Sequence, residues 1–297
     1  MEVYLPKNFT RRSMYDIIGQ IVNEDRQPIS KKVTLNLCEL DFIDPAGVTV
    51  LSNLQEWLVK KGVEVGYRTP SLEVFKTKTA LRYMDDSLFF EQHLGKKIRD
   101  DASPRETTQP LTFVEVKDSF QWFERIISWL ARRINVTTES LANLKMCLQE
   151  IFNNIRDHSS ESLGCAFIQH YPNKNEVTIA ISDFGVGIPY NISKIRPSLN
   201  DAQCISEATI EGFSTKSNPQ NRGAGLVTLI DNVVRDNKGT VFIHSNYGVL
   251  ECKWDNKNDI LKSPRLKNTL YPGTLIEINL RTDNIENVEN DEEDFEW

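Results

Sequence analysis

The chain has 297 residues, of which 26% are charged and 39% hydrophobic, which is typical of a globular protein with one large or two moderate domains. No apolar run approaches the ~20 residues that cross a bilayer, and the first residues lack a secretory-signal pattern, so we expect a cytoplasmic protein without membrane contact. Five scattered cysteines without a Cys-x-x-Cys pair favour reduced thiols over a disulfide framework.

The net charge of −7 is concentrated at the C-terminal end. Residues 283–297 hold eight acidic side chains and no basic ones, so residues 1–282 carry a net charge of +1. A nearly neutral body does not predict direct nucleic-acid binding. We interpret the acidic segment as a disordered tail; the alternative is a partner-binding segment anchored by Phe295 and Trp297.

Residues 1–95 have the pattern of a small α/β domain. Alternating apolar residues predict strands at 33–37 and 63–67. Between them, Asp44 can cap a helix, Pro45 suits its first turn, and apolar side chains at helical spacing continue until Gly62.

The first strand, the turn Asp44-Pro45-Ala46-Gly47 and the helix resemble a STAS domain, the fold of anti-sigma factor antagonists and transporter tails. In phosphorylated members of that family, the residue before the turn's glycine is the acceptor serine or threonine. Ala46 has no hydroxyl group. The resemblance therefore implies a docking or regulatory module that is not phosphorylated here, and the alternative is a generic α/β domain without a regulatory role.

Residues 96–112 are polar, contain two prolines and lack an apolar period, which predicts a linker. The following unit, residues 113–282, begins with a strand-like tract at 113–116 and an amphipathic pattern at 120–134. A second helix is expected over 141–159.

Three polar residues recur every four positions on that second helix. Glu150, Asn154 and His158 therefore lie on one helix face. A carboxylate can accept a proton or orient a nucleophile, and an amide oxygen suits Mg²⁺. The same spacing also occurs on ordinary solvated helix faces.

Two glycine clusters follow the helix. The alternating strand 177–182 ends in Asp183, with Gly185 and Gly187 at i+2 and i+4. Further on, the run 222–226 opens a second helical pattern, and a glycine-rich turn at a helix start can receive phosphate. Taken singly, each cluster is also compatible with a simple turn.

The order of these three motifs resembles the N, G1 and G2 boxes of the GHKL superfamily, the Bergerat-fold ATP-binding domains of gyrase, Hsp90, histidine kinases and MutL. Pro272-Gly273-Thr274 and the strand after it resemble the last box of that family. The resemblance implies an α/β protein whose second unit is a Bergerat sandwich, a mixed sheet with helices on one face.

The resemblance also implies that ATP and Mg²⁺ are bound. Asp183 would accept a hydrogen bond from the adenine amino group, Asn154 would ligate Mg²⁺, and the stretch between Gly187 and Gly223 would form an ATP lid. Further candidates for nucleotide binding are Gly185, Gly187, Thr215, Lys216, Arg222, Gly223, Gly225, Leu226 and Thr274. Glu150 would act as general base, and His158 would orient that end of the site.

Three functions remain open from the sequence. A helix pair before Glu150 resembles the anti-sigma-type branch, which implies a serine/threonine protein kinase acting on a small regulatory partner, itself STAS-like or sigma-factor-like. The alternatives are an ATP-gated switch or slow ATPase that controls a partner or a homodimer, and a non-catalytic interaction protein. A sensor histidine kinase is disfavoured because the neighbours of His93 do not fit a phosphoacceptor motif.

Overall fold

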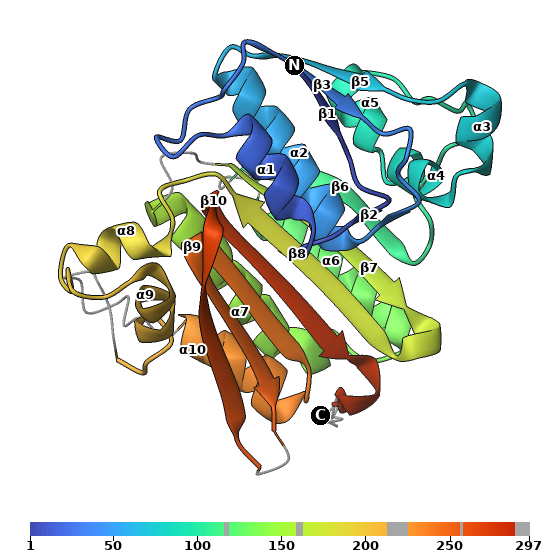
Figure 1. The fold of residues 1–297 in the computed structure, drawn as a ribbon. Helices are drawn as coiled ribbons and strands as arrows, with labels where there is room; N and C mark the ends of the chain where they lie inside the picture. The colour runs from blue at the N-terminus through green and yellow to red at the C-terminus, as the bar shows by residue number, and fades with distance from the viewer. Residues whose placement is uncertain (116–118, 159–162, 213–224, 256–257, 289–297) are drawn as a thin grey trace.

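A computed structural model describes residues 1–115, 119–158, 163–212, 225–255 and 258–288, which form two α/β units (Figure 1). The coarse prediction of an α/β protein is confirmed. Within the described residues, no helix combines the length and apolarity that crossing a bilayer requires.

The N-terminal unit has a three-stranded parallel sheet in the order β1-β3-β5 and a parallel pair of strands, β2 and β4. Its elements are β1 (Glu2–Tyr4), β2 (Asn8–Phe9), α1 (Met14–Ile21), β3 (Lys32–Asn36), β4 (Phe42–Ile43), α2 (Pro45–Lys60), β5 (Glu64–Arg68), α3 (Leu72–Thr77), α4 (Thr79–Asp86) and α5 (Phe89–Leu94).

Helix α2 begins as the sequence predicts. The Asp44 carboxylate accepts a hydrogen bond from the Gly47 N–H at 2.7 Å, and Pro45 occupies the first turn. A Cβ on Gly47 would lie 2.5 Å from the Phe9 carbonyl oxygen, so only glycine fits there. The neighbouring Ala46 is fully buried, so this turn does not present an accessible site for phosphorylation.

The second unit is built on a five-stranded sheet in the order β6-β7-β8-β10-β9. Its elements are β6 (Thr108–Glu115), α6 (Ser119–Ile134), α7 (Ala142–His158), β7 (Leu163–Tyr171), β8 (Glu176–Asp183), α8 (Ile188–Ser193), α9 (Asp201–Glu207), α10 (Gly225–Ile230), β9 (Thr240–Trp254) and β10 (Ile260–Arg281), with short helical turns at Glu139–Leu141, Pro172–Lys174, Asp231–Asp236 and Thr282–Asn284.

All four strand pairings in this sheet are antiparallel, so the expectation of a mixed sheet is wrong. The reason lies in the connections. The short turn between β7 and β8 and the hairpin between β9 and β10 join antiparallel neighbours, whereas parallel strands need a longer crossover.

The sheet is covered on both faces: helices of its own unit pack on one face, and the N-terminal unit covers the other. Helices α6, α7 and α10 lie behind the sheet, and α1 and α2 of the N-terminal unit cross its front (Figure 1). Alternate residues of β8 divide accordingly: Ile179 and Ile181 belong to the core with α6 and α7, and the Asn53 amide of α2 donates to Ser182 Oγ at 3.0 Å.

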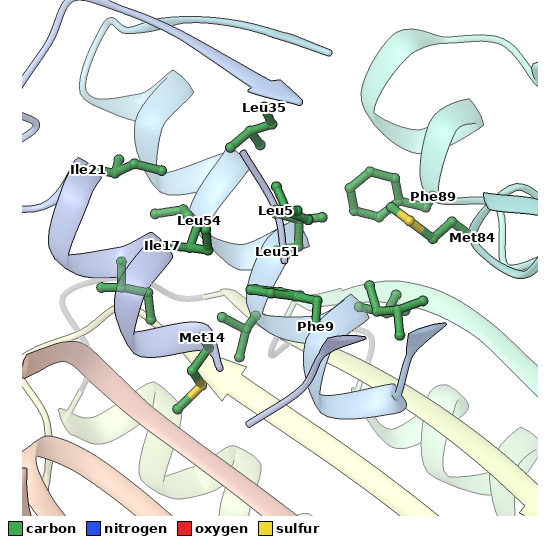
Figure 2. Close-up of a cluster of buried hydrophobic side chains, with 14 of the residues drawn as sticks. Leu5, Phe9, Met14, Ile17, Ile21, Leu35, Leu51, Leu54, Met84 and Phe89 are labelled. Atoms are coloured by element: carbon green, nitrogen blue, oxygen red, sulfur yellow. The ribbon is translucent and has the colours of Figure 1, made fainter. Parts of the chain in front are cut away.

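The N-terminal unit and the front of the sheet share one hydrophobic core. Figure 2 shows side chains from α1 and α2, such as Ile17 and Leu54, meeting others from the N-terminal strands. The same cluster continues into sheet residues, among them Cys165, Phe167 and Tyr271. The two units are therefore held together by core packing, and the docking of the N-terminal unit is part of the fold.

The segment predicted as a linker, residues 96–112, differs from that expectation. Strand β6 already begins at Thr108. Before it, Arg99 is 5% exposed, and its Nε donates to Asp85 Oδ2 at 3.3 Å and its Nη2 to Asp86. Arg105 also donates to Asp86 Oδ2, at 3.0 Å. These ion pairs fix the polar segment against α4, because buried charges must be paired.

The described part of the acidic tail is also held in place. The Thr137 hydroxyl donates to the Val288 carbonyl oxygen at 2.8 Å, and the Val288 N–H donates to Ser140 Oγ at 2.8 Å. Residues 287–288 therefore contact the segment before α7, which the expectation of a disordered tail did not include. Residues 289–297 lie outside the described residues.

His244 is a buried histidine between the two units. Its ring lies 5.3 Å from that of Tyr15 in α1 and 5.2 Å from that of Tyr271 in β10. Neither ring nitrogen has a hydrogen-bond partner within the described part of the chain. Burial lowers the pKa of His244 to about 3, so the ring is neutral in the folded state at pH 7.

Replacing His244 by Phe should reduce the loss of stability in acid. Below pH 6.5 the unfolded chain protonates this histidine and the folded chain does not, so the free energy of unfolding falls as pH decreases toward 3. The wild type should lose roughly 1 kcal/mol more than His244→Phe for each pH unit below about 6. Urea unfolding at pH 7.5, 5.5 and 4.5 measures this difference. An equal fall in the free energy of unfolding of both proteins with decreasing pH would contradict it.

Candidate functional site

The loop after β8 contains the predicted Asp183-Phe184-Gly185-Val186-Gly187 motif. Asp183 is 5% exposed, and its Oδ1 accepts the Gly185 N–H at 2.7 Å, which closes a tight turn. Gly187 has φ = 81°, and a Cβ there would lie 2.7 Å from Ser245 Oγ and 2.8 Å from Asn246 Oδ1. Both the backbone conformation and the lack of space require glycine.

Thr274 lies directly opposite Asp183 in the pairing of β10 with β8. Directly opposed residues point to the same face of a sheet, with Cβ atoms about 5 Å apart. That face is the one covered by α6, α7 and α10, because Ile181 and Ile276, two positions along each strand, belong to the helical core. The structure thus brings together the carboxylate and the threonine of two separate predicted motifs.

Gly273, next to Thr274, allows the two strand ends to approach. Its φ is 115°, and a Cβ would lie 2.1 Å from the Asp183 carbonyl oxygen. Glycine is therefore required at this position of the Pro272-Gly273-Thr274 motif.

Ser245, at the bend of β9, connects the motifs, and sequence reasoning missed it. Its Oγ accepts the Ile188 N–H at 2.9 Å, donates to the Gly273 carbonyl oxygen at 2.8 Å and lies 3.0 Å from Thr274 Oγ1. The adjacent Asn246 has φ = 53° and donates from Nδ2 to the Val186 carbonyl oxygen at 3.4 Å. A Ser-Asn pair within an apolar strand is the signal that could have identified them.

Glu150 of α7 packs directly against the start of α10. A Cβ on Gly225 would lie 1.8 Å from Glu150 Cγ, so the absence of a side chain at Gly225 leaves the room that Glu150 occupies. Glu150 is half-buried. Helix α7 and the start of helix α10 are therefore in contact at this point.

Other predicted site residues fall outside what the structure describes. The backbone of Asn154 and His158 is part of α7, and their side chains lie outside the described residues. Thr215, Lys216, Arg222 and Gly223 also lie outside them. Leu226 is buried in the helical core, where it anchors the first turn of α10. The expected lid includes two helices, α8 and α9, rather than a continuous loop.

A separate cavity of about 360 Å³ lies between α10 and the hairpin of β9 and β10. Its lining contains no residue that the sequence motifs predicted: Glu211, Val227, Ile230, Asp231, Arg235, Asp259, Ile260 and Lys262. Lys262 is already engaged there, because its Nζ donates to the Thr209 carbonyl oxygen at 3.0 Å. We therefore place the candidate site at residues 183–187, which we call the glycine loop, and not in this cavity.

Comparison with known proteins does not assign the chain to a family. No family model matches the sequence, and no curated protein is significantly similar to it. Functional inference for this chain therefore depends on its motifs and on their geometry.

Replacing Gly187 by Ala should destabilise the protein more than replacing Gly62 by Ala. Both glycines have a positive φ, 81° and 75°, so both substitutions carry a backbone strain of about 1–3 kcal/mol, and Gly187, with ψ = 161°, lies in a region that is essentially restricted to glycine. Only at Gly187 does the new Cβ collide with Ser245 and Asn246, and no atom lies within 4 Å of it at Gly62. Thermal and urea unfolding of both variants test this, and equal losses would contradict the crowded environment of Gly187.

Replacing Gly225 by Ala should displace the Glu150 side chain, because the new Cβ would overlap Glu150 Cγ at 1.8 Å and the side chain would have to change its χ1 rotamer. If Glu150 is the general base that the resemblance implies, phosphate release or transfer should fall by at least tenfold while nucleotide affinity changes little. A double-mutant cycle provides the control. In a Glu150→Ala background, Gly225→Ala should cause no further loss, and additive losses would show that Gly225 acts independently of Glu150.

Proposed function

We propose that this protein binds Mg²⁺-ATP and transfers a phosphoryl group to a hydroxyl group of a small regulatory partner protein, as anti-sigma-type serine/threonine kinases do. The observation that carries the proposal is the convergence of four sequence motifs on one face of the sheet. Asp183 and Thr274 are paired on the face covered by α7 and α10, and Glu150 and Gly225 meet between those two helices.

The nucleotide-binding part of the proposal rests on Asp183 and the glycine loop. Asp183 is buried at a strand end, and its Oδ1 already orders the loop through Gly185. A carboxylate in this position can accept a hydrogen bond from an exocyclic amino group, which favours adenine over a base with a carbonyl group there. Gly273 leaves room for the backbone of Asp183 and Phe184, and Gly187 leaves room for the side chains of Ser245 and Asn246.

The catalytic part of the proposal rests on Glu150. Its carboxylate can accept the proton of an attacking hydroxyl group while the rest of the site holds the phosphates. Asn154 stands one helical turn further along α7 and is the proposed Mg²⁺ ligand, with an amide oxygen of the type that hard cations prefer. Bound Mg²⁺ would neutralise the charge that develops on the phosphate oxygens.

An ATP-gated switch is the second candidate, and a specific contact favours it. The N-terminal unit touches the glycine loop itself, because the Trp57 ring of α2 packs edge-on against Phe184 with 5.9 Å between ring centres. Nucleotide binding at that loop could therefore alter the N-terminal unit without any transfer to a partner.

Calorimetric titration with Mg²⁺-ATP tests the proposed binding site. Wild type and Glu150→Gln should bind, whereas Asp183→Asn should bind at least tenfold more weakly, because an amide nitrogen would face the adenine amino group. Absence of binding by the wild type, or unchanged affinity in Asp183→Asn, would contradict the proposed pocket.

Labelled ATP then separates the candidate activities. Label that appears on a co-purified or candidate partner protein and disappears in Glu150→Gln supports the kinase. Release of free phosphate that also disappears in Glu150→Gln supports the switch or ATPase. Binding without either product would leave a non-catalytic nucleotide-binding protein.

A further inference from the structure

The turn after α1 is shaped to present one side chain to the glycine loop. Residues 23–27 form a closed turn in which the Asn23 N–H donates to the Gln27 carbonyl oxygen at 3.0 Å and the Gln27 N–H donates to Asn23 Oδ1 at 2.8 Å. Within it, Arg26 has φ = 56°, a left-handed conformation that is unfavourable for an arginine. Such strain persists only where surrounding contacts hold it.

Arg26 spans from the N-terminal unit to both sides of the candidate nucleotide loop. Its Nη2 donates to Asn246 Oδ1 at 2.7 Å, and its Nη1 donates to the Val186 carbonyl oxygen at 3.2 Å. Val186 lies between the two glycines of the motif. Asn246 is the side chain that lies against Gly187. One guanidinium group therefore joins the loop to β9, and its planar fork of donors holds the two acceptors in a more fixed geometry than the freely rotating ammonium of a lysine would.

Two further contacts support the same strand end from the front of the sheet. Phe184 packs between Trp57 of α2 and Tyr271 of β10, with ring centres 5.9 and 5.3 Å away. Asn53 of α2 donates to Ser182 Oγ, the residue before Asp183. At this strand end Asp183 therefore faces the helices behind the sheet, and its neighbours Ser182 and Phe184 contact the N-terminal unit.

We propose that Arg26 is a positioning residue of the nucleotide site, and that the N-terminal unit serves to pre-order the loop that receives the adenosine part of the ligand. This inference rests on the proposed function. It assigns to the N-terminal unit an intramolecular role in nucleotide affinity, exerted through Arg26 on Val186 and Asn246. Because coupling between two sites is reciprocal, bound nucleotide must also stabilise the turn at residues 23–27 by the same factor.

Titration calorimetry of the full chain with ATP and with ADP tests this role in wild type, Arg26→Ala, Arg26→Lys and Arg12→Ala. Arg26→Ala should weaken both nucleotides equally, by about tenfold, because the affected loop would contact the part that ATP and ADP share. Arg26→Lys should recover part of the loss. Arg12 is an exposed arginine of the same unit, so Arg12→Ala controls for the change in charge and should bind as wild type does.

Hydrogen exchange provides a readout that does not depend on nucleotide. Without ligand, Arg26→Ala should raise exchange at residues 185–188 by at least tenfold and leave the central residues of β8 unchanged. Adding ATP to wild type should slow exchange at residues 23–27. Wild-type binding together with unchanged affinity and exchange in Arg26→Ala would overturn the positioning role alone. Failure of wild type to bind either nucleotide would overturn the proposed function and this role with it.

Discussion

The pairing register of β8 with β10 is the constraint on which the candidate site depends. It sets Asp183 opposite Thr274 and directs both toward the helices, and it leaves Ser182 and Phe184 to face the N-terminal unit. A slip of one residue would move every side chain of the strand to the other face. Because β8 is buried on both faces, such a slip would expose neither face to water but would exchange Asp183 with an apolar neighbour. An unpaired carboxylate within the front core would be strongly unfavourable, so the two cores together hold the register.

Local pattern predicted the elements of this protein better than their arrangement. Helix α2, with its Asp44 cap and Pro45, and strand β8 with its glycine turn were predicted because capping, periodicity and turn chemistry are short-range. The antiparallel sheet and the covered front face depend on which elements pack together, and no short segment carries that information. The outer part of the β9–β10 hairpin is not apparent from the sequence pattern for a related reason: residues 261–267 are mostly exposed and polar, and pairing with β9 holds them in a strand.

The site divides in the same way. The sequence motifs predict Glu150, Asp183, Gly187 and Thr274. In the structure Glu150 contacts the start of α10, and Asp183 lies opposite Thr274. The sequence does not reveal Ser245 and Asn246, which lie in an apolar strand, or Arg26, which belongs to the other unit. These residues hold the motif in shape and have no motif of their own. Residues that support a site are set by three-dimensional proximity, and a single sequence does not show it.

The polar groups within the shared front core give the N-terminal unit a defined orientation. Apolar packing between α2 and the sheet would tolerate small shifts and rotations, since hydrophobic contacts are not directional. The chain of hydrogen bonds from Asn53 to Ser182 and on to the Tyr271 hydroxyl is directional, and it lies in a low-dielectric interior where leaving any member unpaired is costly. Arg11 adds a second fixed point on β10, because its Nη1 donates to Glu277 Oε1 at 2.5 Å. Through these contacts the N-terminal unit is fixed in both position and orientation over the sheet. The turn at residues 23–27 needs that precision in order to place the Arg26 guanidinium group within hydrogen-bond distance of two separate acceptors.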